Sequence, residues 1–245
     1  MNEWVNVDSL PWGKGVRVAA RDENGLIAVD KPSGVLSHPN RKGESSRCLL
    51  NASYDEQMEA YRVGGEAGSG ECLYLLNRLD SATSGLLLMT TNLAVRDLVR
   101  DAFEEKRVRK VYEALVFGVA RSRAGDLWKD RLSVKKAEGG LRASAGGGAT
   151  AETKLLKSAP IPGIPAMSLL TLSPLTGRTH QLRIQASKRG LPIVGDRTYG
   201  DFAKNKQVAR SKGLKRLCLH CTETAVEYRL NGKTFRFKAV SQRLF

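Results

Sequence analysis

Short apolar runs, separated by turn residues, dominate the hydrophobic pattern of the chain. Leu26–Val29 and Leu86–Met89 are continuous runs of the length that is typical of buried strands. Val111–Phe117 is a third, mostly apolar segment that predicts a strand, and it ends at Gly118. An Asn-Gly pair at 231–232 separates the last two runs and predicts a tight hairpin between them. Further strands are expected at 73–76, 150–156, 167–172, 217–219, 226–230 and 234–240.

Two segments have the spacing of helices. Asn92 is of a type that favours the position before a helix, and after it apolar residues recur at intervals of three and four. A second helix is expected to be capped by Thr179 and to end before Gly190. Because strands outnumber helices and do not alternate regularly with them, we predict an α+β fold with a large mixed, mostly antiparallel sheet flanked by helices and loops. The apolar stripe of the first helix consists of Val95, Leu98, Val99, Ala102 and Phe103.

The remaining segments predict the domain organisation. The length of 245 residues allows one large domain or two small ones, and we expect one domain over 21–245 after an N-terminal extension over 1–20. The polar, Gly-rich segment 40–70 is expected to be a loop region with at most a short helix. Residues 121–150 are polar and basic, which predicts either a solvated hairpin or a flexible basic insertion.

The chain is strongly basic, with 40 Lys and Arg against 25 Asp and Glu and a net charge of +15. Such a surplus favours polyanionic partners such as RNA, DNA or an anionic membrane. The apolar fraction of 41% is that of a folded protein, and no apolar run is long enough to cross a membrane. With no secretory signal at the start, the expected location is the cytoplasm. Basic residues are densest at 106–110, 121–136 and 204–216.

Four cysteines raise the question of a metal. Cys218-Leu-His220-Cys221 has the spacing of half a zinc site, but the second ligand pair that a structural zinc site needs is missing. The alternation of this stretch is that of a strand with buried cysteines. We therefore expect reduced, structural cysteines and no metal.

The segment Asn77–Gly85 contains the first candidate chemistry. Asp80 lies between Arg78 and a run of small hydroxyl-bearing residues, in a loop between two apolar segments. An Asp in such a loop often does no more than bond its own backbone. A carboxylate beside a basic residue is also the arrangement of a catalytic acid or base.

A second candidate is Gly177–Arg183. It places Arg178 and Arg183 five residues apart, with His180 and Gln181 between them. Such side chains can donate to a carboxylate or to phosphates. The alternative is an exposed basic helix start.

Together these stretches resemble the RluA family of RNA pseudouridine synthases. The family pattern His-Arg-Leu-Asp, two variable residues and Thr-Ser-Gly-Leu matches at 78–80 and 83–86, and Gly-Arg-Thr-His-Gln-Leu-Arg matches 177–183 without a gap. Asn77 replaces the usual His, which is expected to change detail and not to abolish activity. The segment 1–20 is too short for the S4 RNA-binding domain that many relatives have. The catalytic domain itself is therefore expected to bind the substrate. Further matches in the family's order are Lys31–Gly34, Lys110–Ala114, Pro192–Asp196 and Tyr199–Gly200.

The resemblance implies the pseudouridine synthase fold and conversion of uridine to pseudouridine in RNA without a cofactor. The uracil is detached from the ribose, turned and rejoined through carbon 5. Asp80 is then the catalytic carboxylate, as nucleophile or as base, with Arg183 as its ion-pair partner. Tyr112 is expected to stack on the uracil and to serve proton transfer at carbon 5. Without the resemblance, Tyr112 would be taken as a core aromatic residue.

The same resemblance implies RNA contacts outside the reacting base. Arg78 is expected to fill the gap that the everted nucleotide leaves in the stack. RNA contacts are also expected from Lys110, Arg178, His180 and Gln181.

Two other functions stay open at this point. One is a catalytically inactive RNA-binding protein on the same fold. The other is a glycosidase-like hydrolase with paired carboxylates, for which the nearest second acid is Glu71. The substrate is expected to be structured RNA, either an rRNA or a tRNA stem-loop, and the protein is expected to be a monomer.

Overall fold

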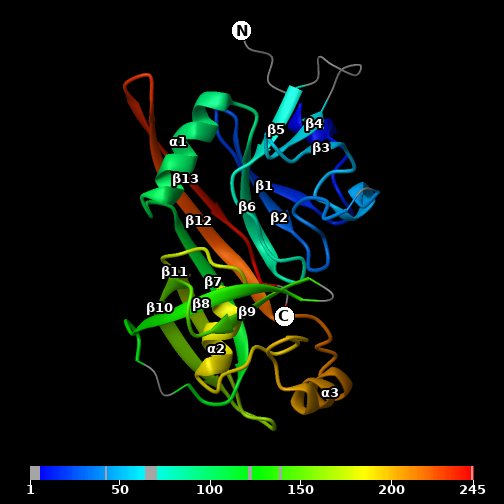
Figure 1. The fold of residues 1–245 in the computed structure, drawn as a ribbon, viewed down its shortest axis with the longest axis vertical. Coiled ribbons are helices and arrows are strands. Elements are labelled where there is room, and N and C mark those ends of the chain that lie inside the picture. Colours follow the sequence, from blue (N-terminus) through cyan, green and yellow to red (C-terminus); the bar gives the residue numbers. More distant parts are fainter. Residues whose placement is uncertain (1–5, 42, 64–70, 121–122, 138–139, 244) are drawn as a thin grey trace. The chain divides into compact units, whose positions relative to one another are not determined.

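The computed structural model describes residues 6–41, 43–63, 71–120, 123–137, 140–243 and 245 (Figure 1). The chain divides into two compact units. The first consists of Met1–Arg109 and Cys221–Gln242, and the second of Lys110–His220 and Arg243–Phe245. The unit boundaries fall within strands β7 (Arg109–Phe117) and β12 (Leu219–Leu230).

Strands of the first unit pair around β6, which is buried along its whole length (Figure 1). Strand β6 pairs with β5 and β2, β2 pairs with β1, and β4 pairs with β3 and β5. Strand β13 pairs with β12, and all of these pairings are antiparallel. The bounds are β1 Arg17–Arg21, β2 Leu26–Lys31, β3 Tyr54–Asp55, β4 Ala60–Val63, β5 Glu71–Leu75, β6 Ser84–Thr90 and β13 Lys233–Val240. Short 3-10 helices lie at Val7–Ser9 and Ser45–Arg47.

The helix of this unit confirms the predicted stripe. Helix α1 spans Leu93–Glu104 and buries Val95, Val99 and Ala102. The Asn92 side chain accepts from the backbone N–H groups of the first turn, and so satisfies donors that have no partner within the helix.

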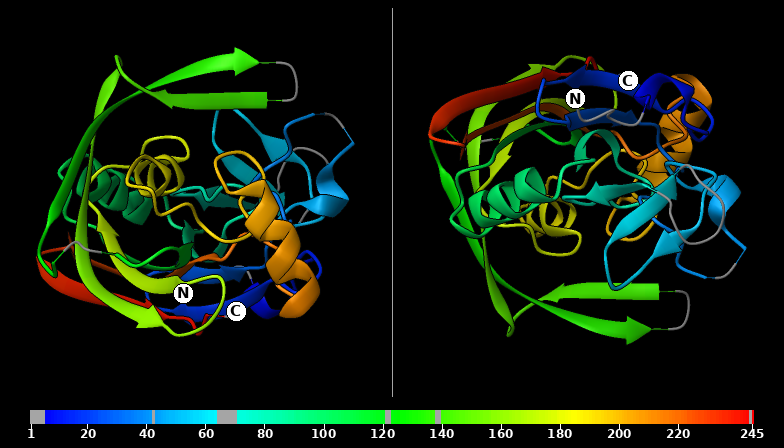
Figure 2. Two further views of the ribbon diagram at one scale, coloured as in Figure 1. Left: turned by 90° about the horizontal axis from the view of Figure 1, so that it is seen from below. Right: turned by 90° about the horizontal axis from the view of Figure 1, so that it is seen from above.

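The second unit has the strand order β7-β11-β10-β8-β9, with antiparallel pairing throughout. The segment 121–150 therefore contains the hairpin that was one of its two predicted alternatives, and Figure 2 shows β8 and β9 (green) side by side. The tip at 138–139 lies outside the described residues. The bounds are β8 Leu127–Ala137, β9 Gly140–Ala145, β10 Ala149–Ile161, β11 Met167–Pro174, α2 Gln181–Lys188 and α3 Phe202–Ser211.

Most predicted elements are confirmed, including the α+β class and the turn at Asn231-Gly232, where both residues have positive φ. Three expectations were wrong. Segment 40–70 contains strands β3 and β4, and β12 is one strand where two were expected. Helix α2 begins after His180 and not at a Thr179 cap, because the Gln181 side chain accepts from Arg178 N and ties down the preceding turn.

Candidate active site

Two loops of the first unit lie at the same end of the β2–β6 pair. Strand β2 ends at Lys31, β6 begins at Ser84, and their antiparallel pairing places Lys31 opposite Gly85. The segment after β2 and the segment before β6, which contains Asp80, are therefore neighbours. Sequence spacing alone does not show this proximity.

Hydrogen bonds between these loops fix the backbone next to Asp80. The carbonyl of Ser81 accepts from Gly34 N at 2.7 Å and from Lys31 Nζ at 3.1 Å. The Ser33 hydroxyl donates to the carbonyl of Ala82 at 2.7 Å. The loop is thus held by the Lys-Pro-Ser-Gly segment as well as by its own turn.

The other side of Asp80 is held by Ser37. Its buried hydroxyl donates to Leu79 O at 2.9 Å and accepts from Leu79 N at 3.1 Å. Within the loop, Thr83 N donates to Asp80 O at 3.0 Å, which closes a turn. Because backbone on both sides is anchored, the backbone position of Asp80 is restricted before any substrate binds.

Lys31 is a buried cation next to Asp80, and sequence reasoning gave it no role. Its side chain is fully buried, and Nζ donates to the carbonyls of Val35, Pro32 and Ser81. Burial lowers the pKa of Lys31 to about 7, whereas the negative charge of Asp80 acts to raise it. Three carbonyl acceptors match the three N–H donors of an ammonium group, which favours the charged form. Lys31 therefore lies close enough to Asp80 for the two side chains to interact electrostatically.

Arg78 is exposed, and its side chain lies against an imidazole. Arg78 Nη1 donates to His38 Nε2 at 3.1 Å, and His38 Nδ1 lies 3.0 Å from the carbonyl of Pro39. Both contacts are satisfied by one neutral tautomer of His38, with the proton on Nδ1 and a lone pair on Nε2. The His38 ring stacks on Tyr54 at 5.2 Å between centroids. A neutral acceptor orients the guanidinium and leaves its charge available for a phosphate.

Asn77, the departure from the family pattern, has a backbone partner. Its side-chain oxygen accepts from Leu88 N of β6 at 2.8 Å. The residue therefore helps to join the loop to the strand that follows it.

Helix α2 of the second unit is polar yet buried. Gln181, Gln185 and Arg189 recur at intervals of four residues and therefore share one face. On this face Gln185 donates to carbonyls of β8 and β10 and to Asp130, and Arg189 also donates to Asp130. These bonds fix the rotation of the helix and direct Arg183 to another side.

On that other side, Arg183 forms a buried bidentate ion pair with Asp196. Arg183 Nε and Nη2 donate to the two carboxylate oxygens at 2.8 and 2.9 Å, and both side chains are almost inaccessible to solvent. Burial by itself raises the pKa of Asp196, but hydrogen bonds and charge from Arg183 outweigh it and hold the pKa below its usual range. Backbone N–H groups of Tyr199 and Thr198 also donate to Asp196.

Three predicted RNA-contact residues lie at the start of α2. Gln181 is buried, and its amide makes four contacts within the protein, with Thr176, Arg178, Glu152 and Thr153. This occupancy favours a positioning role for Gln181 over a direct RNA contact. His180 Nδ1 contacts the Tyr199 hydroxyl at 2.9 Å, and exposed Arg178 donates to Thr150 O at 3.2 Å.

Tyr112 and Lys110 lie on β7. Tyr112 is buried and pairs in register with Leu172 of β11, and Lys110 is partly exposed. Asp80 belongs to the first unit and Tyr112 and Arg183 to the second, so their predicted meeting stays a prediction.

The cysteines are unpaired, and Cys48, Cys218 and Cys221 are buried. Burial raises the pKa of Cys218 to about 11. The described part of the chain contains no group of three or more His, Cys, Asp or Glu side chains placed to hold a metal ion. In that same part, none of the helices has the length and apolarity that a membrane crossing requires.

A family model described as RNA pseudouridylate synthase matches residues 25–188. The chain belongs to the RNA pseudouridylate synthase family. The resemblance to the RluA group is confirmed, because the chain is 30% identical over 220 residues to the dual-specificity RNA pseudouridine synthase RluA of Haemophilus influenzae. That match covers 89% of this chain and 90% of the relative.

Other members of the family differ in length. The chain is 31% identical over 224 residues to the ribosomal large subunit pseudouridine synthase C of Rickettsia felis, covering 89% of this chain but 65% of that relative. It is 28% identical over 237 residues to the tRNA pseudouridine synthase C of Yersinia pestis, covering 91% of this chain and 86% of the relative.

Solved structures of the family share the fold. Human RNA Pseudouridylate Synthase Domain Containing 4 superposes with a TM-score of 0.63 at 20% identity, over 93% of this chain and 88% of that one. Human RNA Pseudouridylate Synthase Domain Containing 1 superposes with a TM-score of 0.59 at 22% identity, over 94% of this chain and 90% of that one. The pseudouridine synthase fold is therefore shown for this chain.

Sequence reasoning missed several residues of the candidate site. Lys31 and Asp196 lie in two segments that match the family pattern, but the sequence alone indicates no role for either residue. Ser37 and His38 lie shortly after the Lys31–Gly34 match, but their partners lie about 40 residues further along the chain. Only the pairing of β2 with β6 makes these contacts evident.

Proposed function

We propose that this protein is an RNA pseudouridine synthase that isomerises specific uridines in structured RNA, with Asp80 as the catalytic carboxylate. The main support is that the family match at 25–188 includes the candidate residues of both units. The hydrogen bonds that hold the loop backbone around Asp80 add physical support, since a catalytic carboxylate must be carried on a fixed segment.

The proposed reaction is an isomerisation with no net oxidation. The bond between uracil N1 and ribose C1′ breaks, and a bond between uracil C5 and C1′ forms. The hydrogen on C5 leaves as a proton, and N1 gains one. Asp80 acts at the sugar as a nucleophile or as a base, and both roles require its ionised form.

The other candidate residues have complementary roles in this proposal. Arg183, which forms a bidentate pair with Asp196, is the proposed ion-pair partner of Asp80. Tyr112 stacks on the uracil and serves the proton transfer at C5. Arg78, oriented by His38, enters the space that the everted nucleotide leaves.

The proposed substrate is rRNA or tRNA. Relatives of this chain are named as ribosomal large subunit, tRNA and dual-specificity enzymes. The net charge of +15 agrees with a polyanionic substrate, because cations that neutralise phosphates release bound counterions.

The test compares Asp80→Asn with Asp97→Asn. Asp97 is an exposed residue of α1 that pairs with Arg96, so its loss removes the same charge outside the proposed site. We expect tritium release from carbon 5 of labelled uridine to fall at least a thousandfold in Asp80→Asn, while RNA affinity in filter binding stays within a fewfold of wild type. Asp97→Asn should behave as wild type in both assays.

Two results would contradict the proposal. Turnover by Asp80→Asn would remove this carboxylate from the mechanism. A wild-type protein that binds rRNA and tRNA from cells lacking the gene, yet forms no pseudouridine in either, would be an RNA-binding protein without catalysis.

A further inference from the structure

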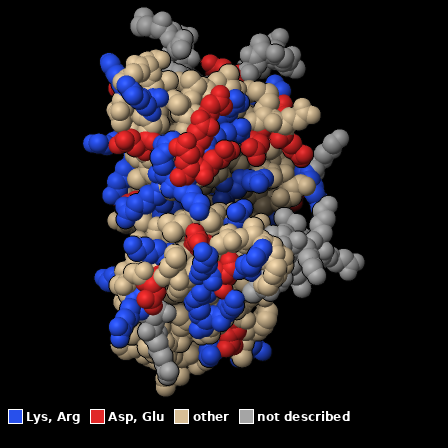
Figure 3. All heavy atoms as spheres, turned by 60° about the vertical axis from the view of Figure 1, so that its left-hand side comes forward, with Lys and Arg blue, Asp and Glu red and all other residues tan. Residues whose placement is uncertain are grey.

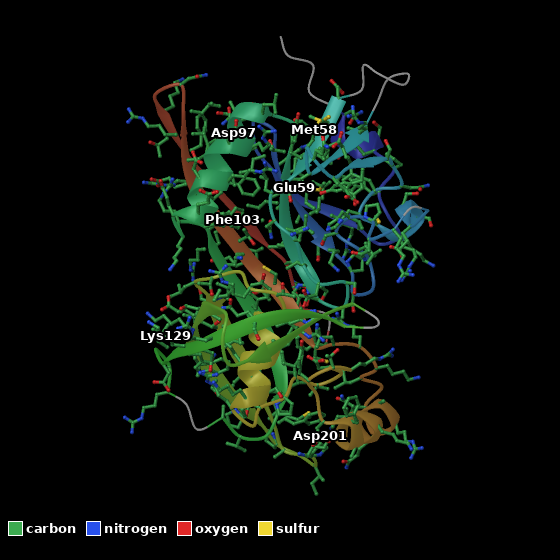
Figure 4. All side chains as sticks on the ribbon, viewed as in Figure 1. Met58, Glu59, Asp97, Phe103, Lys129 and Asp201 are labelled. Carbon is green, nitrogen blue, oxygen red and sulfur yellow. The ribbon has the colours of Figure 1, made fainter. Side chains whose placement is uncertain are left out.

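Helix α3 and the loops beside it carry an unusual concentration of positive charge. Residues 197–216 contain seven Lys and Arg and one exposed or partly exposed acid, Asp201, which begins α3 (Figure 4). The other acid nearby, Asp196, is buried in its pair with Arg183. The cations are Arg197, Lys204, Lys206, Arg210, Lys212, Lys215 and Arg216.

Most of these charges are not neutralised by the protein. Asp201 caps the helix through Lys204 N and pairs with Lys204 Nζ at 3.0 Å, so it is already engaged. Within the described residues, Lys206, Arg210 and Lys212 form no ion pair, and neither do Arg197 and Lys215. All five are exposed.

Helix α1 has the opposite arrangement, although it also lies on the surface. Its Arg96 pairs with Asp97, and its Arg100 pairs with Glu59. On the face shown in Figure 3, Asp and Glu side chains lie directly beside Lys and Arg. The cations of α1 are thus neutralised by nearby acids, whereas most of those on and beside α3 are not.

The outward face of α3 also exposes an aromatic ring. Phe202, Lys206 and Arg210 recur at intervals of four residues and lie on one face, and Phe202 is 66% exposed. Like charges four residues apart destabilise a helix, and an exposed Phe gains nothing from burial. The face therefore has features that folding alone does not favour.

The inner face of α3 fixes this surface to the rest of its unit. Val208 is buried, and Asn205 accepts from Gly195 N at 2.7 Å and donates to Asp196 O at 3.0 Å. The same Asp196 holds Arg183 through its carboxylate. The basic face is thus attached firmly to the segment that positions a candidate catalytic residue.

We propose that the outward face of α3, formed by Phe202, Lys206 and Arg210, together with Lys212 directly after the helix, is an RNA-docking surface that binds backbone phosphates with its cations and stacks an unpaired base on Phe202. This inference rests on the proposed function for its choice of polyanion. Cations that lack acidic partners are suited to phosphates, and an exposed ring among them is suited to the unstacked bases of RNA loops.

The test uses two variants with the same change in net charge. The first combines Lys206→Gln, Arg210→Gln and Lys212→Gln. The control combines Arg21→Gln, Arg236→Gln and Lys238→Gln, which are exposed cations that already pair with Asp8, Glu227 and Glu223. Melting curves first establish that both variants fold, and Phe202→Ala is measured alongside them.

Binding to purified bulk tRNA and to rRNA is then followed over a range of salt concentrations. We expect the α3 variant to weaken binding by more than tenfold and to lower the slope of log affinity against log salt by about 2–3, since each phosphate contact contributes about 0.7–0.9. KM for RNA should rise in parallel. Phe202→Ala should weaken binding without changing the slope, and the control should retain both affinity and activity.

The outcomes separate this surface from the proposed function. Equal losses of RNA affinity in the two charge variants would show that only the overall positive charge matters, and would overturn the α3 surface. Wild-type RNA affinity in the α3 variant would also overturn it. If the α3 variant loses binding to vesicles of phosphatidylcholine and phosphatidylserine but binds RNA as wild type does, the RNA-docking surface is overturned in favour of a membrane surface. If wild-type protein forms no pseudouridine but the α3 variant alone loses RNA, the surface stands and the catalytic proposal fails.

Discussion

Replacing Asp196 by Asn tests the buried pair on which the placement of Arg183 depends. The Asp196 carboxylate accepts two bonds from Arg183 and two from the backbone N–H groups of Thr198 and Tyr199. Asn retains one oxygen and presents an NH₂ group to the guanidinium, so a donor faces a donor. Breaking a buried ion pair on one side costs about 3–5 kcal/mol, because the remaining buried charge loses its carboxylate partner.

The expected result is a large drop in thermal stability. For a chain of this length, about 3–5 kcal/mol corresponds to a fall in Tm on the order of 10 °C. The matched control is Asp201→Asn, since Asn caps a helix as well as Asp and the pair of Asp201 with Lys204 is partly exposed. We expect that control to lose less than about 1 kcal/mol in thermal melts followed by circular dichroism.

The dependence on pH gives a second test. The pKa of Asp196 in the folded protein lies below its usual range, so its ionised form stabilises the fold above the unfolded pKa of about 3.9. This stability is lost as the pH falls from that value through the folded pKa. The difference in stability between wild type and Asp196→Asn should therefore have its full size at neutral pH and decrease below about pH 4. Equal Tm values for Asp196→Asn and Asp201→Asn would refute the reasoning. So would a stability difference between wild type and Asp196→Asn that does not vary with pH.

Two further predictions concern the loops around Asp80. Gly85 has φ of +108° and a Cβ there would overlap the backbone of Cys221, whereas Gly34 has φ of +94° and open space. Gly85→Ala should therefore lower stability in chemical denaturation by at least about 2 kcal/mol, and Gly34→Ala by only about 1, and similar losses would contradict the steric argument. His38→Ala should reduce kcat/KM about tenfold by releasing Arg78, with little further loss in an Arg78→Ala background. Fully additive losses would show that His38 acts independently of Arg78.

The sequence determined the local structure of this protein well. Continuous apolar runs predicted β2 and β6, because a strand buried on both faces needs apolar residues at nearly every position, and a mostly apolar segment predicted β7. Spacing and a cap predicted α1, and Asn231-Gly232 predicted the last turn. Helix α3 was missed because Val208 is its single buried residue, which leaves too weak a period to detect.

Motifs in the sequence also identified the family and its candidate residues, since a catalytic segment keeps its residue types in a fixed order. The partners of those residues were decided only by tertiary structure. Lys31 reaches Ser81, His38 reaches Arg78, and Arg183 reaches Asp196 because strand pairing and helix packing bring distant segments together. Hydrogen bonds and ion pairs act over a few ångströms in space, and separation along the chain does not measure that distance.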